Sequence, residues 1–199
     1  MNRHRLIMVA AAVLIAAASL TAARVGEPAP KFSNVATTGK TYALTDLKGR
    51  WVVLEWHNPS CEFTQKHYNS GNMPKLQKEW TAKGVIWLTV VSPGIATDHV
   101  DAYLKSRGGA PTAVLLDTNA TMAMAYSAKT SPQMFVIDPK GTLVYNGAID
   151  DKPTADLADV PGAKNFVSAA LTEAMAGRRV TIPTSRPYGC SVKYPGSTH

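Results

Sequence analysis

The chain has 199 residues, of which 45% are hydrophobic, 18% charged and 8% aromatic, a composition that is ordinary for a globular protein. The formal net charge of +7 is mild, and no run of lysine and arginine is interleaved with aromatic residues, so nucleic acid is not expected as a partner. The two cysteines, Cys61 and Cys190, are too few for a disulfide-dense scaffold or a four-cysteine zinc site. These two cysteines therefore either form one disulfide or are two free thiols.

The first 23 residues have the pattern of a secretory signal peptide. Two arginines lie at the start, Leu6 to Leu20 is apolar except for Ser19, and residues 21–23 are small, as signal peptidase requires. The alternative is an uncleaved membrane anchor, but the apolar stretch is too short for a hydrocarbon core of about 30 Å, so we expect cleavage near Ala23 and no membrane span afterwards. Cleavage would leave 176 residues with 19 basic and 14 acidic side chains, a net charge of +5. The mature protein is then periplasmic or secreted, where disulfides persist.

After the leader, hydrophobic runs and turn residues alternate between strand and helix patterns. The run Trp51–Trp56 is apolar on both faces except at Glu55, which is typical of a central strand covered on both sides. Further strands are expected at 32–35, 41–44, 85–91, 113–116, 134–137 and 142–145. Helices are expected at 61–68, 74–83, 97–107, 118–126 and 163–176. Residues 150–162 have the composition of a surface loop.

This order of elements predicts an α/β fold with a mixed central sheet flanked by helices on both faces. The crossovers make part of the sheet parallel, and the hairpin at 134–145 makes the rest antiparallel. The order is that of the thioredoxin fold, with residues 24–177 as the domain and 178–199 as a C-terminal tail that carries Cys190. In such a fold Cys61 lies where a central strand ends and a helix begins.

Cys61 is the first candidate for chemistry. The expected helix is capped by Ser60, and its free N–H groups and dipole would favour the thiolate, lowering the thiol pKa from about 8.5 towards neutrality. Thr64 lies one turn further on, where its hydroxyl could donate a hydrogen bond to the sulfur. An inert, buried structural cysteine is the alternative interpretation. The spacing is C-x-x-T, so the usual nearby second cysteine is missing.

Glu55 and His57 lie close to this cysteine in the sequence. Glu55 could be a partly buried carboxylate with a raised pKa that relays protons during thiol exchange, or it could lie in water at the end of its strand. His57 could stabilise the thiolate, although a solvated loop position fits it better. No standard metal-ligand spacing, phosphate loop or hydrolytic triad is present in the sequence, so neither a metal nor a cofactor is expected.

Several segments keep the order and spacing of a known family. They are Asp46–Trp56, Cys61–Thr64 followed by Lys66-His67-Tyr68, Pro132 just before Phe135–Asp138, and Gly141–Asp150. Together, over about residues 25–177, they resemble the thioredoxin-like redoxin group that includes the alkyl hydroperoxide reductase and thiol-specific antioxidant (AhpC/TSA) proteins. The tail Pro187–Tyr194 resembles an ending found in exported redoxin-like proteins that have a single helix-start cysteine.

The resemblance implies that Cys61 is the nucleophile and that Pro132 is a cis-proline facing it. A cis Ser131-Pro132 bond would leave nearby backbone groups free to hydrogen-bond an extended substrate beside the sulfur. Pro59 and Ser60, directly before the cysteine, are expected on the same substrate-binding surface.

The chain departs from its relatives in two ways. Thr64 stands at the second-cysteine position of thioredoxins, which puts dithiol exchange in doubt unless Cys190 takes that part. The peroxiredoxin signature P-x-x-x-T-x-x-C would need proline at position 54 and threonine at position 58, where this chain has Leu54 and Asn58.

Two cysteines in an exported chain are most simply paired with each other. The bond would be either a structural staple or a reversible couple in which Cys190 resolves a mixed disulfide or sulfenic acid on Cys61, a part that a mobile tail would suit. The leading hypothesis is an exported thiol-disulfide oxidoreductase that acts on protein or small-molecule disulfides with an unidentified electron donor. The alternatives are a thiol peroxidase acting on a hydroperoxide and a non-catalytic binding module with a structural disulfide.

Overall fold

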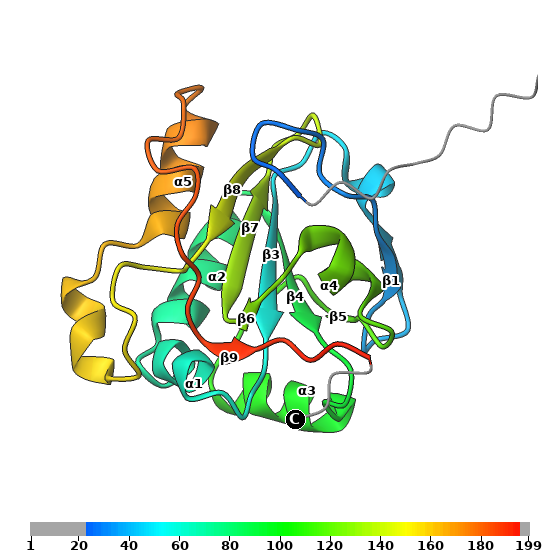
Figure 1. The fold of residues 1–199 in the computed structure, drawn as a ribbon, viewed down its shortest axis with the longest axis vertical. Helices are drawn as coiled ribbons and strands as arrows, with labels where there is room; N and C mark the ends of the chain where they lie inside the picture. Colours follow the sequence, from blue (N-terminus) through cyan, green and yellow to red (C-terminus); the bar gives the residue numbers. More distant parts are fainter. Residues whose placement is uncertain (1–22, 196–199) are drawn as a thin grey trace, which may run out of the picture.

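The structure is a computed structural model that describes residues 23–195, so the expected signal peptide lies, apart from Ala23, outside the described residues. At the centre is a five-stranded sheet in which three parallel strands adjoin an antiparallel hairpin (Figure 1). In spatial order the strands are β5 (Ala113–Leu116), β4 (Ile86–Val91), β3 (Val52–His57), β7 (Gln133–Ile137) and β8 (Leu143–Gly147). The run that is apolar on both faces, β3, occupies the middle, as its sequence predicts.

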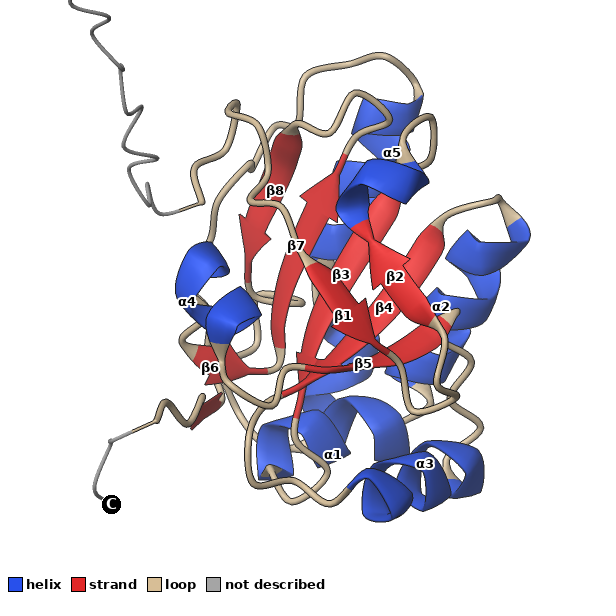
Figure 2. Ribbon diagram, turned by 90° about the vertical axis from the view of Figure 1, so that its right-hand side faces the viewer, coloured by secondary structure: helices blue, strands red, loops and turns tan. Residues whose placement is uncertain are grey.

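Side chains along β3 alternate between two hydrophobic cores, one on each face of the sheet. Leu54 and Trp56 belong to the core that is covered by α4 (Thr121–Tyr126) and by the hairpin of β1 (Ser33–Val35) and β2 (Thr41–Ala43), which Figure 2 shows in front of the sheet. The helices that cover the other core are α1 (Glu62–Asn69), α2 (Asn72–Ala82), α3 (Thr97–Ser106) and α5 (Phe166–Met175). No helix within residues 23–195 has the length and apolar character needed to cross a membrane.

The predicted α/β thioredoxin fold is therefore confirmed, and the differences concern element boundaries and a few short elements that were not predicted. The helix expected from residue 118 begins at Thr121, because the Asp117 carboxylate accepts the N–H groups of Met122 and Ala123. Two short 3₁₀ helices also form. The first, η1 (Leu44–Leu47), directly follows β2, and the second, η2 (Leu157–Gly162), occupies the end of the expected surface loop.

The expected interruption after the first helix is present. Gly71 adopts φ +75°, in the left-handed region that favours glycine, and α2 begins directly after it at Asn72. Pro74 lies in the first turn of α2, where its missing N–H costs no hydrogen bond. The break allows α1 and α2 to contact each other while both cover the same face of the sheet.

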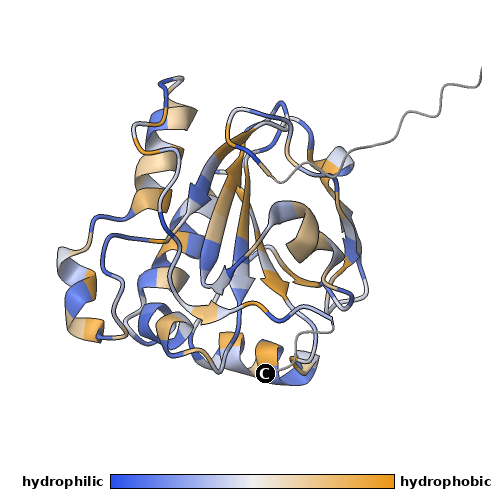
Figure 3. Cartoon of the chain, in the orientation of Figure 1, coloured by the Kyte–Doolittle hydropathy of each residue, from blue (hydrophilic) through white to orange (hydrophobic). Residues whose placement is uncertain are grey.

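The tail after α5 is held along the domain, which differs from the expectation of a mobile segment. The Asn146 N–H donates to the Pro183 carbonyl over 3.1 Å, so the tail runs beside the edge strand β8. Further on, β9 (Cys190–Ser191) pairs antiparallel with β6 (Thr130–Ser131), and Val192 is buried in the core beneath α4. In Figure 1 this segment crosses below β3 and β7, whose lower ends are hydrophilic in Figure 3.

Gly189 is the residue that allows β9 to approach β6 so closely. Its φ is +140°, and a Cβ atom at this position would overlap the Ser131 carbonyl. We predict that Gly189→Ala displaces β9 and lowers the equilibrium constant for closing the Cys61–Cys190 disulfide by about tenfold or more. The measurement is alkylation and mass spectrometry after equilibration in glutathione redox buffers.

Gly162→Ala is the matched control for this substitution, because a Cβ at Gly162 meets open space and the backbone is not left-handed. The equilibrium constant of the control should equal that of the unmodified protein. If Gly189→Ala closes its disulfide as readily as the control does, the close approach of β9 to β6 is not required for pairing the cysteines.

Candidate functional site

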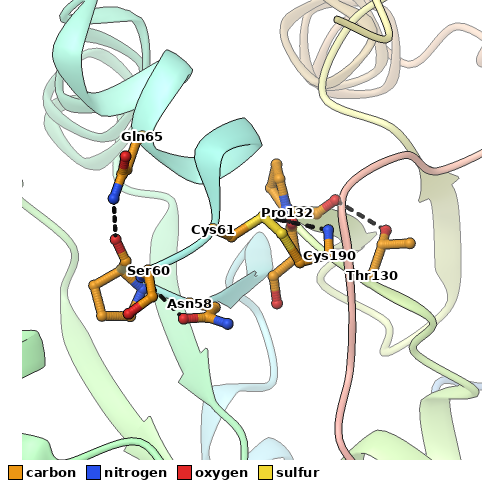
Figure 4. The surroundings of a disulfide bond; sticks show 9 residues. Asn58, Ser60, Cys61, Gln65, Thr130, Pro132 and Cys190 are labelled. Carbon is orange, nitrogen blue, oxygen red and sulfur yellow. Dashed lines mark hydrogen bonds between the residues drawn. A yellow bond between two sulfur atoms is a disulfide. The ribbon is translucent and has the colours of Figure 1, made fainter. Parts of the chain in front are cut away.

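The end of β3 and the start of α1 place Cys61 against the β6–β9 pair (Figure 4). Cys61 is the N-cap of α1 and has extended backbone geometry, with φ −81° and ψ 124°. It forms a disulfide with Cys190, and the two Cα atoms are 5.8 Å apart. Cys190 is in turn the register partner of Ser131 on β6. Pairing of the tail strand thus brings together two sulfurs whose residues are 129 positions apart.

The two cysteines differ in exposure and in surroundings. Cys61 is 1% exposed, whereas Cys190 is partly exposed. The Sγ atom of Cys61 lies 3.0 Å from the Ser131 carbonyl oxygen and 3.2 Å from the backbone nitrogen of Cys190, whose N–H points at it. A thiolate at Cys61 would therefore be stabilised by this N–H and by the start of α1.

The Ser131-Pro132 peptide bond is cis, as expected. Gln133 holds this loop, because its Oε1 accepts the Lys129 N–H over 2.7 Å and its Nε2 donates to Asn146 Oδ1 over 2.9 Å. The backbone groups that sequence reasoning left free for a substrate are instead paired with β9. The tail occupies the edge beside Ser131 that an extended substrate was expected to use.

Pro59 and Ser60 differ in their exposure. Pro59 is buried, and its carbonyl accepts a hydrogen bond of 2.9 Å from Gln65 Nε2. Ser60 is exposed and does not cap α1; its N–H donates to Asn58 Oδ1 over 3.0 Å. This Asx turn carries the chain one residue further before the helix begins, so Cys61 takes the N-cap position predicted for Ser60.

A polar cleft of about 320 Å³ lies beside the disulfide. Its lining comes from the loop before α1 (Asn58 and Ser60), the β6–β9 region (Ser131 and Ser191–Lys193), and the segment Ser92–Ala96 with His99. Ser60 and Ser131, both predicted for the substrate surface, therefore share one concavity. Pro59 and Pro132 support the loops behind them and do not line it.

Thr64 does not make the hydrogen bond predicted for it. The side chain is buried one turn after Cys61, but its Oγ1 has no hydrogen-bond partner among residues 23–195. The reason is that Cys61 Sγ is bonded to Cys190 and lies against the Ser131 carbonyl.

Glu55 is a fully buried carboxylate rather than a partly buried one. Its oxygens contact His57 Nδ1 at 3.3 Å, Tyr68 OH at 2.8 Å, Gln77 Nε2 at 2.9 Å, Trp87 Nε1 at 2.8 Å and Thr89 Oγ1 at 3.3 Å. Burial alone would raise its pKa, but the hydrogen bond and charge of His57 and the bonds from Trp87 and Tyr68 lower it below the usual value. Both interpretations offered by the sequence, a partly buried carboxylate with a raised pKa and a carboxylate in water at the strand end, are therefore contradicted.

His57 is likewise not the solvated loop histidine that its sequence position favoured. It is the last residue of β3, is fully buried, and packs edge-on against Tyr68 with ring centroids 5.1 Å apart. The partners of Glu55 and His57 come from α1, α2, α3 and β4. No local sequence signal links these elements to β3.

A second buried polar cluster, which the sequence did not indicate, holds the tail two residues before Cys190. Asn72 Nδ2 donates to His67 Nδ1 over 2.9 Å, so His67 Nε2 carries the proton and donates to the Tyr188 hydroxyl oxygen over 3.1 Å. The Tyr188 hydroxyl donates in turn to Asp150 Oδ1. Burial and the positive charge of Lys66 lower the pKa of His67 to about 3, which keeps the ring neutral.

Tyr188→Phe removes the hydroxyl that links the tail to Asp150. Asp150 Oδ1 also accepts the Lys152 N–H over 3.0 Å, but the second oxygen of Asp150 is buried and has no partner within the described part of the chain, so loss of the Tyr188 hydroxyl removes a large part of the hydrogen bonding to this carboxylate. We expect the free energy of unfolding of the oxidised protein, measured by urea denaturation, to fall by about 1–3 kcal/mol. Tyr103→Phe is the matched control, because the buried Tyr103 hydroxyl has no partner among residues 23–195. Equal losses in the two variants would contradict the role given to Tyr188.

The lowered pKa of Glu55 should make the stability of the protein depend on pH in the acidic range. Because the folded-state pKa lies below the unfolded value of about 4.3, the carboxylate stabilises the protein fully above that pH and loses its contribution as the pH falls through the folded value. Glu55→Gln should lower the free energy of unfolding by about 3 kcal/mol at pH 7. The difference in free energy of unfolding between the variant and the unmodified protein should become smaller below about pH 4.

Urea denaturation between pH 7 and pH 3 measures this gap. The control is Glu79→Gln, which removes an exposed carboxylate paired with Lys83 over 2.7 Å and should change the stability little at any pH. A Glu55→Gln gap that stays constant or widens in acid would show that the pKa of Glu55 is not lowered.

The chain is similar to proteins of a known family. The sequence model of the AhpC/TSA family matches residues 25–146. The thiol-disulfide oxidoreductase ResA of Bacillus subtilis (strain 168) is 33% identical over 119 residues, which is 60% of this chain and 64% of ResA. This chain therefore spans less than two thirds of the length of that relative.

Solved structures share the fold. An uncharacterized conserved protein from Geobacillus kaustophilus has a TM-score of 0.74 at 23% identity, covering 88% of this chain and 94% of that one. The pneumococcal exposed lipoprotein thioredoxin from Streptococcus pneumoniae strain TIGR4 has a TM-score of 0.51 at 24% identity, covering 66% and 97%. The family match spans more than half of the chain, from the arm before β1 through Cys61 and Pro132 to β8. The chain belongs to the AhpC/TSA family.

Proposed function

We propose that the protein is a thiol-disulfide oxidoreductase in which the Cys61–Cys190 pair alternates between disulfide and dithiol. The observation that carries the proposal is a disulfide between a helix-start cysteine and a partly exposed tail cysteine, beside a polar cleft. The likeness to ResA supports the same chemistry. Cys190 then takes the part of the second cysteine, because the position that this cysteine has in thioredoxins is occupied here by Thr64.

The reaction needs two electrons and no cofactor. A donor thiolate attacks one sulfur of the pair, forming a mixed disulfide and releasing the other cysteine as a thiolate. A second donor thiol attacks the mixed disulfide, leaves as the oxidised donor and frees the second cysteine. In the reverse direction the reduced pair transfers the two electrons to a protein or small-molecule disulfide. The donor belongs to the class of dithiols or paired monothiols.

The other predicted residues take supporting parts in this proposal. Ser60 and Ser131 line the cleft in which a substrate would lie, and Pro59 and Pro132 hold the loops that carry them. The unpartnered Thr64 hydroxyl is available to Cys61 Sγ once the disulfide opens. Glu55 has donors on both carboxylate oxygens, which favours a fixed negative charge behind β3 over a proton relay.

The proposal extends to the compartment and the division of the chain. The composition of the first 23 residues supports a signal peptide cleaved near Ala23, and hence a periplasmic or secreted protein. Residues 24–177 then form the redoxin domain and residues 178–199 the tail. An oxidising compartment suits a protein that relies on a disulfide between its only two cysteines.

Insulin reduction by dithiothreitol tests the proposed activity. The mature protein should accelerate insulin precipitation by about tenfold or more over the uncatalysed reaction, and Cys61→Ser and Cys190→Ser should each lose this acceleration. Circular dichroism confirms that the variants are folded. An unmodified protein no faster than Cys61→Ser would overturn the proposal.

A parallel assay of hydrogen peroxide consumption with the same variants distinguishes the alternatives. Stoichiometric loss of hydrogen peroxide that depends on Cys61 would identify a thiol peroxidase, which lacks support from Leu54 and Asn58 in the signature positions. Neither activity, together with a disulfide that resists reduction, would identify a binding module with a structural staple.

A further inference from the structure

We propose that reductants open the disulfide at Cys190, so that the mixed disulfide forms on the tail cysteine and Cys61 leaves as the thiolate. The inference rests on the proposed function, because it concerns the order of steps in the same redox couple. It exchanges the parts expected from the sequence, in which Cys61 carries the mixed disulfide and Cys190 resolves it. Three independent features of the site support it.

The first feature is access. An attacking thiolate must reach the sulfur that it bonds to, and Cys61 is 1% exposed, with the buried Ser131 carbonyl against its Sγ. Cys190 is partly exposed, and Ser191 beside it is exposed. The strand pair β6–β9 that joins the cysteines therefore covers Cys61 and leaves Cys190 partly exposed.

The second feature is the stability of the leaving group. A thiolate leaves more readily when its thiol has the lower pKa. Cys61 stands at the N-terminus of the eight-residue α1, and the Cys190 N–H lies 3.2 Å from its Sγ. Cys190 lies in a two-residue strand, an element without a comparable dipole. Attack at Cys190 expels the sulfur that lies at the helix N-terminus and accepts the Cys190 N–H, and these two effects oppose the repulsion from the Ser131 carbonyl oxygen 3.0 Å away.

The third feature is that contacts other than the disulfide hold the tail on both sides of Cys190. Before it, the Tyr188 hydroxyl donates to Asp150, and the ring packs edge-on against Phe63 with centroids 5.7 Å apart. After it, the Val192 N–H donates to the Lys129 carbonyl over 2.9 Å. Breaking the S–S bond leaves these contacts in place. Cys61 consequently stays covered while Cys190 stays within its reach.

The steps balance in both directions. A donor thiolate forms a bond to Cys190 Sγ as the bond to Cys61 Sγ breaks, and Cys61 keeps the electron pair. A second donor thiol then attacks the donor sulfur of the mixed disulfide and releases Cys190, which takes up a proton from water. When the protein acts as the reductant, Cys190 attacks the substrate disulfide, and Cys61 displaces the reduced substrate by attacking Cys190 Sγ.

The site of attack can be located directly with the oxidised protein and reduced glutathione. The mixture is quenched at short intervals with acid and N-ethylmaleimide, digested without reductant and analysed by mass spectrometry. Extrapolated to zero time, glutathione should be on Cys190 and maleimide on Cys61 in at least about tenfold excess over the reverse pattern. Equal labelling, or glutathione mainly on Cys61, would overturn the inference.

Unfolding provides the internal control. In guanidinium chloride, neither the cover over Cys61 nor the start of α1 persists, so the labelling ratio should fall towards one. If unfolding does not change this ratio, the preference of glutathione for Cys190 comes from the neighbouring residues in the sequence and not from the fold. That result would also contradict the inference.

Single-cysteine variants give a second, independent measurement. With Ellman's reagent in excess, Cys61→Ser leaves only Cys190 to react, and Cys190→Ser leaves only Cys61. The Cys190 thiol should react faster, and adding Tyr188→Ala to Cys190→Ser should accelerate the reaction of Cys61 by loosening the tail. A Cys61 thiol that already reacts faster than Cys190 in the single variants would show that the tail does not cover it.

Failure of this inference and failure of the proposed function have different signatures. Insulin reduction reports the function, whereas the position of glutathione reports the order of attack. A protein that reduces insulin but carries glutathione on Cys61 keeps its function and refutes the inference. A protein that carries glutathione on Cys190 without reducing insulin refutes the function alone.

Discussion

The pairing of β9 with β6 is the constraint on which the rest of the site depends. Because Cys190 and Ser131 are register partners, the tail places the Cys190 sulfur at the start of α1 and also covers Cys61. The close approach requires Gly189, since any side chain there would meet the Ser131 carbonyl. The C-terminal segment of the chain thus covers the edge beside Ser131.

Buried polar groups behind the site connect the tail to the sheet. Lys66 is fully buried, donates to the Lys152 carbonyl over 2.7 Å and lies 5.6 Å from the Tyr188 ring centroid. On the other side of α1, Tyr68 donates to the Glu55 carboxylate. A single short helix thus carries the Cys61 sulfur at its N-terminus and contributes to two buried polar clusters along its length. These clusters hold α1 rigidly against both β3 and the tail.

Most of the fold could be predicted from the sequence, because the signals lie within short segments. The strand at 113–116 has the predicted bounds, the break between α1 and α2 lies where Gly71 allows it, and Pro132 is cis as the resemblance implied. The site was predicted less completely. Cys61 and Cys190 are paired, but the predicted Ser60 cap, both interpretations of Glu55 and the solvated position of His57 were wrong.

By itself, the sequence determined the alternation of strands and helices and the position of Cys61 at a strand–helix junction, since periodicity and turn chemistry act between near neighbours in the chain. It also limited the thiols to two cysteines. The tertiary structure alone decided which sulfur is covered, the direction of the Glu55 pKa shift and the anchoring of an irregular tail. Those properties depend on donors, acceptors and surfaces that come from distant segments. Only folding brings them within hydrogen-bond distance.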